Sequence, residues 1–300
     1  MASLLIIGGT GFFGKSILDS YKRGLLNEFN ISKILVLARN IDKFRLEFPE
    51  LIINGVELIS GDISSITFLP EVDFVIHAAT STQLNDYIQT SDNLGIKSIE
   101  KSISNYCSLA PNFHFNSKIL YCSSGAVYGK QPVNIDKIEE NFPFQQNLND
   151  LSIEKQNYCL GKRFAENEIL KLGNLGLNVS IARCFAFSGK YLPKNQHYAL
   201  GNFIGKAEKG EDIIVNTNGI VYRSYLDADE LVISLIKILQ VSSCECPIYN
   251  VGSDKAISIN ELAKAISVKY SVNYSCPNLN QNIIIDRYVP SVEKLRKLFE

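Results

Sequence analysis

Tyr158 and Lys162 stand four residues apart in a segment whose apolar residues recur with helical spacing. Residues four apart lie on one face of a helix, so a phenol and an ammonium at this spacing can act as one acid-base unit. A phenol titrates near pH ~10 in water, and a neighbouring ammonium favours its charged form. Ser124 follows the apolar run Lys118–Tyr121 and could hydrogen-bond the oxygen on which this pair acts. The three residues indicate proton transfer at an oxygen; an ordinary helix surface and a serine turn are the alternative.

A glycine-rich turn near the N-terminus supplies a second set of candidate residues. It follows an apolar, strand-like run and opens a helix-like segment, which is the setting of a dinucleotide fingerprint. Glycines let the backbone approach a pyrophosphate, and the N–H groups of a helix N-terminus bind it. A turn without a ligand is the alternative. The expected cofactor contacts here are Gly8, Thr10, Gly11, Phe12, Phe13 and Gly14.

The end of the second expected strand bears on the choice of cofactor. An NAD site usually places a carboxylate there for the ribose 2′-hydroxyl, whereas this chain has Arg39 followed by Asn40. A guanidinium can pair with a 2′-phosphate through two donors at once. We therefore favour NADP(H), with NAD(H) still possible and an exposed surface arginine as the alternative.

Further cofactor contacts are expected where the third and fourth strands end. A carboxylate after the third strand could accept a hydrogen bond from the adenine amino group. Small residues after the fourth strand would let the ribose and pyrophosphate lie against the backbone. His77, inside that apolar run, is expected to be a buried core residue rather than a catalyst. The expected contacts at these two ends are Asp62, Ile63, Ala78, Ala79 and Thr80.

These residues need a scaffold, and short apolar runs alternating with helix-like segments predict one. The expected strands are Leu4–Ile7, Ile34–Leu37, Val56–Ile59, Phe74–Ile76, Lys118–Tyr121 and Val179–Ala182, with Tyr249–Val251 returning to the same sheet. The expected helices are Phe12–Leu26, Asn93–Ser108, Asn157–Leu172 and Asp227–Leu239. The pattern is that of a Rossmann-type, doubly wound α/β fold, which binds ligands at the carboxyl ends of its parallel strands.

Two segments fit this alternation less well and predict a smaller, discontinuous lobe. Residues 1–186 and 227–254 are expected to form the dinucleotide-binding domain. Residues 187–226 and 255–300 are expected to form a substrate-binding lobe over the carboxyl ends of the strands.

Composition excludes several classes of protein. Thirty basic residues against 31 acidic ones leave no positive excess, so a nucleic-acid partner is not expected. No apolar run is long enough to span a bilayer, and the N-terminal apolar run is too short for a secretion signal. Seven scattered cysteines suit reduced thiols, and the three histidines lack ligand spacing, so we expect a cytoplasmic protein without a metal site.

In this order and spacing, the motifs resemble the extended short-chain dehydrogenase/reductases that modify nucleotide sugars, also called the epimerase/dehydratase family. The resemblance spans Leu4 to about Leu298. It implies that Ser124, Tyr158 and Lys162 are catalytic, and that the protein forms a homodimer through the helix carrying Tyr158. The matching motifs are the glycine turn, His77 to Ala79, Asn93, Ser124 to Gly129, Tyr158 with Lys162, Arg183 to Gly189, Arg223 to Asp227 with Asp229, and Tyr249 to Gly252. Further cofactor contacts implied in this way are Asn93, Tyr158, Lys162 and Phe185.

The resemblance also implies that the small lobe binds the diphosphate of a sugar nucleotide. An arginine suits this task because it stays charged and binds two oxygens at once. Arg223 is the chief candidate, and an ion pair with Asp227 or Asp229 is its alternative role. The expected substrate-binding residues are Ser81, Ser124, Asn202, Phe203, Arg223 and Arg287.

The residues that follow Ser124 narrow the reaction. The family's 4,6-dehydratases carry an acidic pair where this chain has Gly125 and Ala126, and its fucose-forming epimerases place a cysteine at Gly125. Redox at one carbon, C4 of the hexose, remains. Arg39 favours reduction of the C4 keto group of an NDP-4-keto-6-deoxy sugar by NADPH, with Tyr158 as proton donor. The alternatives are a 4-epimerase with retained cofactor, a non-catalytic NADP-binding redox sensor, and a reductase of lipophilic ketones.

Overall fold

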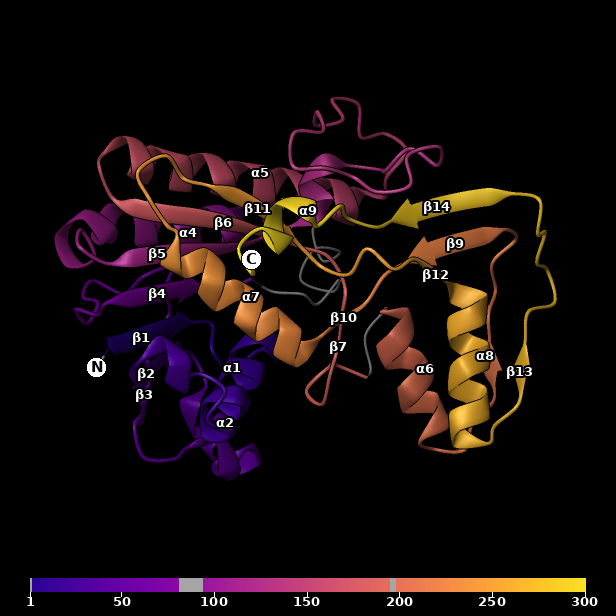
Figure 1. Cartoon of the computed structure of the whole chain (residues 1–300), viewed down its shortest axis with the longest axis horizontal. Helices are drawn as coiled ribbons and strands as arrows, with labels where there is room; N and C mark the ends of the chain where they lie inside the picture. Colours follow the sequence, from indigo (N-terminus) through magenta and orange to yellow (C-terminus); the bar gives the residue numbers. More distant parts are fainter. Residues whose placement is uncertain (1, 81–93, 195–197) are drawn as a thin grey trace.

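The computed structural model describes residues 2–80, 94–194 and 198–300. Ser81 and Asn93, predicted to contact substrate and cofactor, lie outside the described residues. Helices and strands from the whole length of the chain build a large sheet domain and a smaller group of elements beside it (Figure 1).

A seven-stranded sheet of order β11-β6-β5-β4-β1-β2-β3 forms the centre of the larger part. Every neighbouring pair in it runs parallel. The chain passes from β1 through β2 to β3, returns to β4 beside β1 and continues outward, so the predicted doubly wound sheet is confirmed. The strand order reverses between β1 and β4, and sheets of this kind bind ligands beyond the carboxyl ends of the strands at such a point. The strands are β1 (Ala2–Ile7), β2 (Ile31–Ala38), β3 (Val56–Ser60), β4 (Phe74–His77), β5 (Lys118–Ser124), β6 (Asn178–Cys184) and β11 (Ile248–Val251).

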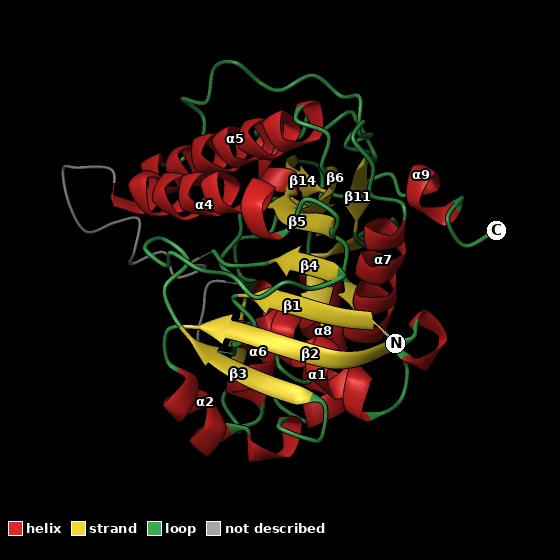
Figure 2. Ribbon diagram, turned by 90° about the vertical axis from the view of Figure 1, so that its left-hand side faces the viewer, coloured by secondary structure: helices red, strands yellow, loops and turns green. Residues whose placement is uncertain are grey.

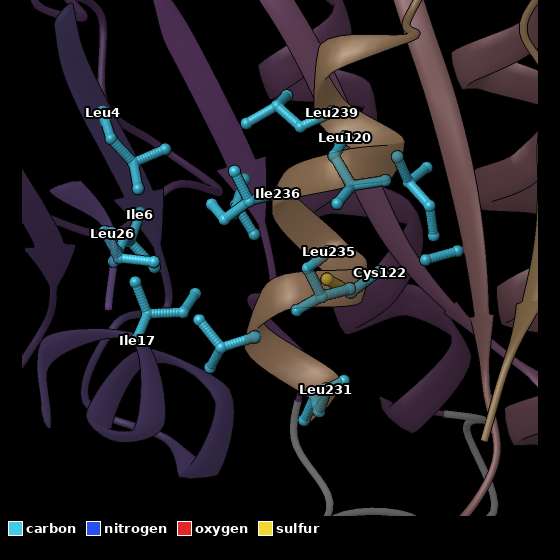
Figure 3. Packing of buried hydrophobic residues seen from close by; sticks show 14 of the residues in the cluster. Leu4, Ile6, Ile17, Leu26, Leu120, Cys122, Leu231, Leu235, Ile236 and Leu239 are labelled. Carbon is cyan, nitrogen blue, oxygen red and sulfur yellow. The ribbon is translucent and has the colours of Figure 1, made fainter. Parts of the chain in front are cut away.

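Helices cover both faces of this sheet, with α4 and α5 on one side and α7 on the other (Figure 2). Successive strand side chains point to opposite faces, so Leu4 and Ile6 of β1 enter one core while Leu5 and Ile7 enter the other. Figure 3 shows Leu231, Leu235, Ile236 and Leu239 of α7 close to Leu4, Ile6, Leu120 and Cys122 of the sheet. Each fully buried Leu or Ile contributes about 1.5–3 kcal/mol, and the two cores together fix the strand ends. The helices are α1 (Phe12–Lys22), α2 (Ile41–Glu47), α4 (Leu94–Phe113), α5 (Ile153–Asn174) and α7 (Ala228–Gln240), with short 3-10 turns η1 (Asn27–Phe29), η2 (Pro49–Leu51) and η3 (Gly125–Tyr128).

Three helix ends differ clearly from their predicted positions, and one of them is the start of α5, which lies at Ile153 instead of Asn157. The first helix stops at Lys22 instead of Leu26, because Gly24 takes a φ of +78° and its N–H bonds the carbonyl of Tyr21. Helix α4 continues past the predicted end at Ser108 to Phe113 and includes Pro111 in its last turn. A proline there removes one N–H donor from the last turn of the helix, while Ala110 just before it is buried.

A second group of elements lies beside the large sheet and appears on the right of Figure 1. Its core contains Phe203 and Leu200 of α6, Ile213 of β8 and Ala263 of α8. A three-stranded sheet of order β12-β9-β14 completes it, with β9 and β14 parallel. Its elements are α6 (Ala199–Ala207), β8 (Ile213–Ile214), β9 (Ile220–Arg223), β12 (Ile257–Ser258), α8 (Ile259–Tyr270), β13 (Tyr274–Ser275) and β14 (Ile284–Tyr288). The pair β7 (Phe187–Ser188) and β10 (Leu226–Asp227) connects this group to the large sheet.

The last residues return to the large sheet. Val292 and Leu295, the latter on α9 (Glu293–Arg296), join the core that contains β1 and α7. The prediction assigned residues 255–300 to the lobe, whereas the side chains of Val292 and Leu295 pack in the core of the large sheet. The remaining domain boundaries stay a prediction.

Candidate functional site

The glycine turn between β1 and α1 needs its glycines for two physical reasons. Gly8 has a φ of +83°, and a Cβ on it would lie 2.6 Å from Cα of Ala79. A Cβ on Gly14 would lie 2.0 Å from the carbonyl oxygen of Gly9, so α1 could not pack this close to the turn. Gly11 precedes the first residue of α1, Phe12. The first N–H groups of a helix lack intrahelical partners, so this turn presents donors at the carboxyl edge of the sheet.

The end of β4 lies directly against this turn. Ala78 donates its N–H to the carbonyl of Ile7 at 2.9 Å, and the backbone of Ala79 fills the space beside Gly8. Thr80 continues toward α5, where its hydroxyl meets Lys162. The glycine turn, the end of β4 and α5 therefore meet at one edge, as the sequence predicts.

Lys162 is almost fully buried, with 2% of its surface exposed. Its Nζ donates to Oγ1 of Thr80 at 2.8 Å, to the carbonyl of Cys122 at 2.9 Å and to Oη of Tyr121 at 3.1 Å. Burial lowers the pKa of Lys162 to about 8. The ammonium also lies 5.9 Å from the centre of the Tyr158 ring, so its charge acts on that phenol.

Ser124 ends β5 and begins the 3-10 turn η3. Its Oγ accepts the N–H of Ala126 at 3.2 Å and lies 3.5 Å from Oη of Tyr288. Tyr288 ends β14, 164 residues later in the chain, and burial raises the pKa of its phenol. Tyr288 was not among the predicted site residues, although it directly follows the candidate Arg287. The feature of the sequence that could have indicated Tyr288 is an aromatic residue at the end of a strand-like run.

Gly125, directly after Ser124, faces the ring of Phe185. A Cβ on Gly125 would lie 2.6 to 2.8 Å from three atoms of that ring, so no larger residue fits there without displacing it. The Phe185 ring also packs against Tyr288, with centroids 4.6 Å apart and the ring planes tilted by 35°. Phe185, predicted to contact the cofactor, thus forms an aromatic wall with Tyr288 beside Ser124.

A buried ion pair supports the strands beneath this site. Arg183 of β6 donates to Glu166 of α5 at 2.8 Å, and Glu166 also accepts the hydroxyl of Ser123 at 2.5 Å. A second nitrogen of Arg183 donates to Oη of Tyr128, whose hydroxyl donates to Asn250. A buried charge is tolerated when it is paired and hydrogen-bonded in this way. The pair fixes α5, β5 and β6 relative to one another, and with them Tyr158, Lys162 and Ser124.

The predicted adenine and 2′-phosphate residues lie where β2 and β3 end. Arg39 and Asn40 are exposed. Asp62 accepts the N–H of Ser64 at 2.9 Å, and this bond, with a smaller contribution from the charge of Arg39, lowers its pKa. Ile63 is buried in the core beneath α4. Asp62 therefore shapes a turn, and Arg39 lies close enough for its charge to act on that carboxylate.

The two predicted phosphate arginines lie on opposite faces of the β12-β9-β14 sheet. Paired residues of neighbouring strands share a face, and Arg223 pairs with Tyr288 while Arg287 pairs with Tyr222. Arg223 forms an ion pair with Asp286 at 2.5 Å on the face of Tyr288 and Ser124. The guanidinium of Arg287 instead lies 4.5 Å from the Tyr222 ring centre and 3.4 Å from Asp136. Arg287 therefore does not face Arg223, Tyr288 and Ser124, because successive side chains of a strand point to opposite faces.

Asn202 and Phe203, predicted to bind substrate, lie on α6. Phe203 is buried in the core of the lobe, so packing alone explains why this position is aromatic. Asn202 is partly exposed on the same helix. His77, expected in the core, is 1% exposed, and burial lowers its pKa to about 3, so it is neutral.

Residues 2–80, 94–194 and 198–300 contain no cluster of three or more His, Cys, Asp or Glu side chains arranged to hold a metal ion. Across the same residues, no helix combines the length and apolar character needed to cross a membrane.

Known proteins resemble this chain both in sequence and in fold. The sequence model of the NAD dependent epimerase/dehydratase family matches residues 4–252 of the chain. Among curated proteins, UDP-glucuronic acid decarboxylase 6 of Arabidopsis thaliana is 25% identical over 269 residues, which cover 88% of this chain and 73% of the relative.

Two solved structures share the fold over nearly the whole chain. UDP-glucose 4-epimerase of Thermotoga maritima, determined with UDP-glucose, superposes with a TM-score of 0.78 at 16% identity and covers 98% of this chain and 91% of its own. A dTDP-glucose 4,6-dehydratase double mutant of Streptomyces venezuelae, determined with NAD, gives 0.79 at 17% identity, with 98% and 89% covered. At such identities the likeness establishes the arrangement of the elements, and the chemistry must come from the residues of this chain.

Proposed function

The chain belongs to the NAD dependent epimerase/dehydratase family, and we propose that it reduces the C4 keto group of a nucleotide-linked 4-keto-6-deoxyhexose. The observation that carries the proposal is the meeting of the glycine turn, Ser124 and the Tyr158/Lys162 helix at one edge of the sheet. When bound, the nicotinamide cofactor supplies the hydride. Tyr158 donates the proton to the sugar oxygen, Ser124 holds that oxygen by a hydrogen bond, and the charge of Lys162 stabilises the phenolate that remains.

The surroundings of Gly125 support a reaction confined to one carbon. Elimination or epimerisation at further carbons needs another acid or base close to the sugar. The Phe185 ring occupies the space that a side chain at Gly125 would need, and Ala126 has no ionisable group. An aromatic wall of Phe185 and Tyr288 instead offers an apolar surface to the sugar ring.

Two features support the choice of cofactor and substrate. Arg39 is exposed at the end of β2, where a guanidinium could bind a 2′-phosphate, and this favours NADPH over NADH. Arg223 lies on the face of the lobe sheet that carries Tyr288, 23% exposed and oriented by Asp286, and would bind the diphosphate. With Arg287 on the opposite face, we assign the phosphate contact to Arg223 and not to Arg287.

The second candidate is a 4-epimerase that retains its cofactor. The observation in its favour is the superposition with UDP-glucose 4-epimerase over 98% of this chain. Both reactions use the same phenol, ammonium and hydroxyl. They differ in whether the cofactor is exchanged after each turnover.

Assembly and location belong to the same proposal. Ile153 and Leu160 stand seven residues apart on α5 with 57% and 45% of their surfaces exposed, and we propose that these two apolar side chains contribute to a homodimer interface. The seven cysteines are unpaired, which suits a reducing cytoplasm.

Nicotinamide absorbance at equilibrium and during turnover separates the candidates. Steady loss of NADPH with a nucleotide-linked 4-keto-6-deoxyhexose supports the reductase. No loss of NADPH, with a C4 epimer formed from UDP-glucose, supports the epimerase. UDP-glucuronic acid is the third substrate to include, since the Arabidopsis relative is a decarboxylase of that compound. NADPH binding without change in any of the three sugars contradicts both candidates and supports the redox sensor.

A further inference from the structure

Lys162 is held by three oxygens that surround its buried ammonium. They belong to Thr80 at the end of β4 and to Tyr121 and Cys122 of β5, at 2.8, 3.1 and 2.9 Å from Nζ. An ammonium carries three N–H donors and no acceptor, so the oxygens match its donors in number. Two of the three come from side chains, which a substitution can remove without altering the backbone.

The orientation of these oxygens suits a positive charge. The Thr80 hydroxyl donates its own hydrogen to the carbonyl of Ala79 at 2.8 Å, so its lone pairs face Lys162. The carbonyl of Cys122 can only accept. The Tyr121 ring also lies under the ammonium, with its centroid 4.8 Å from Nζ. Each contact stabilises the charged form against the cost of burial.

The other ionisable groups around Lys162 come from three strands and its own helix. Glu166 of α5 and the thiols of Cys122 and Cys184 raise the pKa of Lys162, and burial outweighs them. Glu166 is itself bonded to Ser123 and Arg183. His77 of β4 is neutral. Among the described residues, the oxygens that accept hydrogen bonds from the ammonium are all uncharged.

We propose that Thr80 and Tyr121 are positioning residues that clamp the ammonium of Lys162 one helical turn from Tyr158. The clamp keeps the lysine charged inside a buried site, and that charge stabilises the Tyr158 phenolate. The proposal rests on the proposed function, because it assigns the purpose of the charge to Tyr158. The clamp itself is a property of the folded protein before any ligand binds.

Direct titration of Lys162 tests the clamp. The protein is labelled with lysine carrying 13C at Cε, and the Lys162 signal is assigned by its loss in Lys162→Met. We expect an inflection near pH 8 in the unaltered protein, and a value about one pH unit lower in Thr80→Val and in Tyr121→Phe. Thr80→Ser keeps the hydroxyl and should restore the original value. Tyr106→Phe is the matched control, since the hydroxyl of this buried tyrosine lies 3.4 Å from His114 instead.

The same inflection in all these proteins would overturn the clamp. Circular dichroism establishes that each variant is folded, and Tyr121→Phe provides a reading even if Thr80→Val fails to fold. The titration needs no turnover, so it separates the two proposals. A shifted inflection in a protein that is inactive on sugar nucleotides contradicts the proposed function and supports the clamp. In an active protein, the clamp also predicts that the Tyr158-dependent limb of the pH–rate profile moves upward in both variants, as a purely structural role would not.

Discussion

Replacing Gly125 by alanine should disrupt the aromatic wall beside Ser124. The added Cβ would lie 2.6 to 2.8 Å from ring atoms of Phe185, well inside van der Waals contact. The ring of Tyr288 borders Phe185, with centroids 4.6 Å apart, so a displaced Phe185 ring would press on Tyr288. Overpacking of this kind costs about 1–3 kcal/mol.

The effect on activity should exceed the effect on stability. A displaced Phe185 pushes Tyr288, whose hydroxyl lies 3.5 Å from Oγ of Ser124. We expect Gly125→Ala to lower the free energy of unfolding by about 2 kcal/mol and kcat/KM by about a hundredfold. Urea unfolding and NADPH oxidation measure the two quantities.

A double-mutant cycle identifies the contact responsible. Phe185→Leu alone opens space beside Gly125, and in combination with Gly125→Ala it should remove the clash. The two changes should therefore be non-additive, with a coupling free energy of about 1–3 kcal/mol. Additive effects, or a Gly125→Ala variant as stable and active as the unaltered protein, would refute the assignment of this space to Phe185.

Three further predictions test the site's charges. Between pH 8 and 10.5, the unaltered protein should gain about 3 kcal/mol of stability relative to Lys162→Met, because the unfolded lysine still holds its proton there while the folded one has lost it. A pH-independent difference in urea unfolding would contradict the lowered pKa. Glu166→Gln should lower the free energy of unfolding in urea by about 3 kcal/mol, because it leaves Arg183 buried without its charged partner. The control is Glu168→Gln on the same helix, which should lower it by less than about 1 kcal/mol because its partner Lys171 is exposed. Arg39→Ala should raise KM for NADPH about tenfold and leave KM for NADH unchanged, and equal changes for both cofactors would argue against a 2′-phosphate contact.

The sequence was informative wherever chemistry follows from local spacing. Tyr158 and Lys162 share a helix face because they are four residues apart. The glycine turn lies between a strand and a helix whose apolar patterns are visible in the sequence. Apolar runs such as Leu4–Ile7 predicted strands because a parallel sheet buried on both faces requires them.

Contacts between distant segments were beyond the reach of the sequence. The packing of Phe185 against Gly125 and Tyr288 joins the segments that follow β5 and β6 to the end of β14. The faces of Arg223 and Arg287 depend on the register of β9 with β14, which shifts between Ile284 and Asp286. A shift of one residue moves every later side chain to the opposite face, and no local pattern reveals it.

Turnover by a Tyr158→Phe variant tests the central claim most directly. The phenylalanine keeps the ring in place and removes only the hydroxyl that donates the proton. We expect that NADPH still binds within about twofold of its normal affinity, while its oxidation by a nucleotide-linked 4-keto-6-deoxyhexose falls by at least a factor of about 1,000. Undiminished NADPH oxidation by this variant would contradict the central claim.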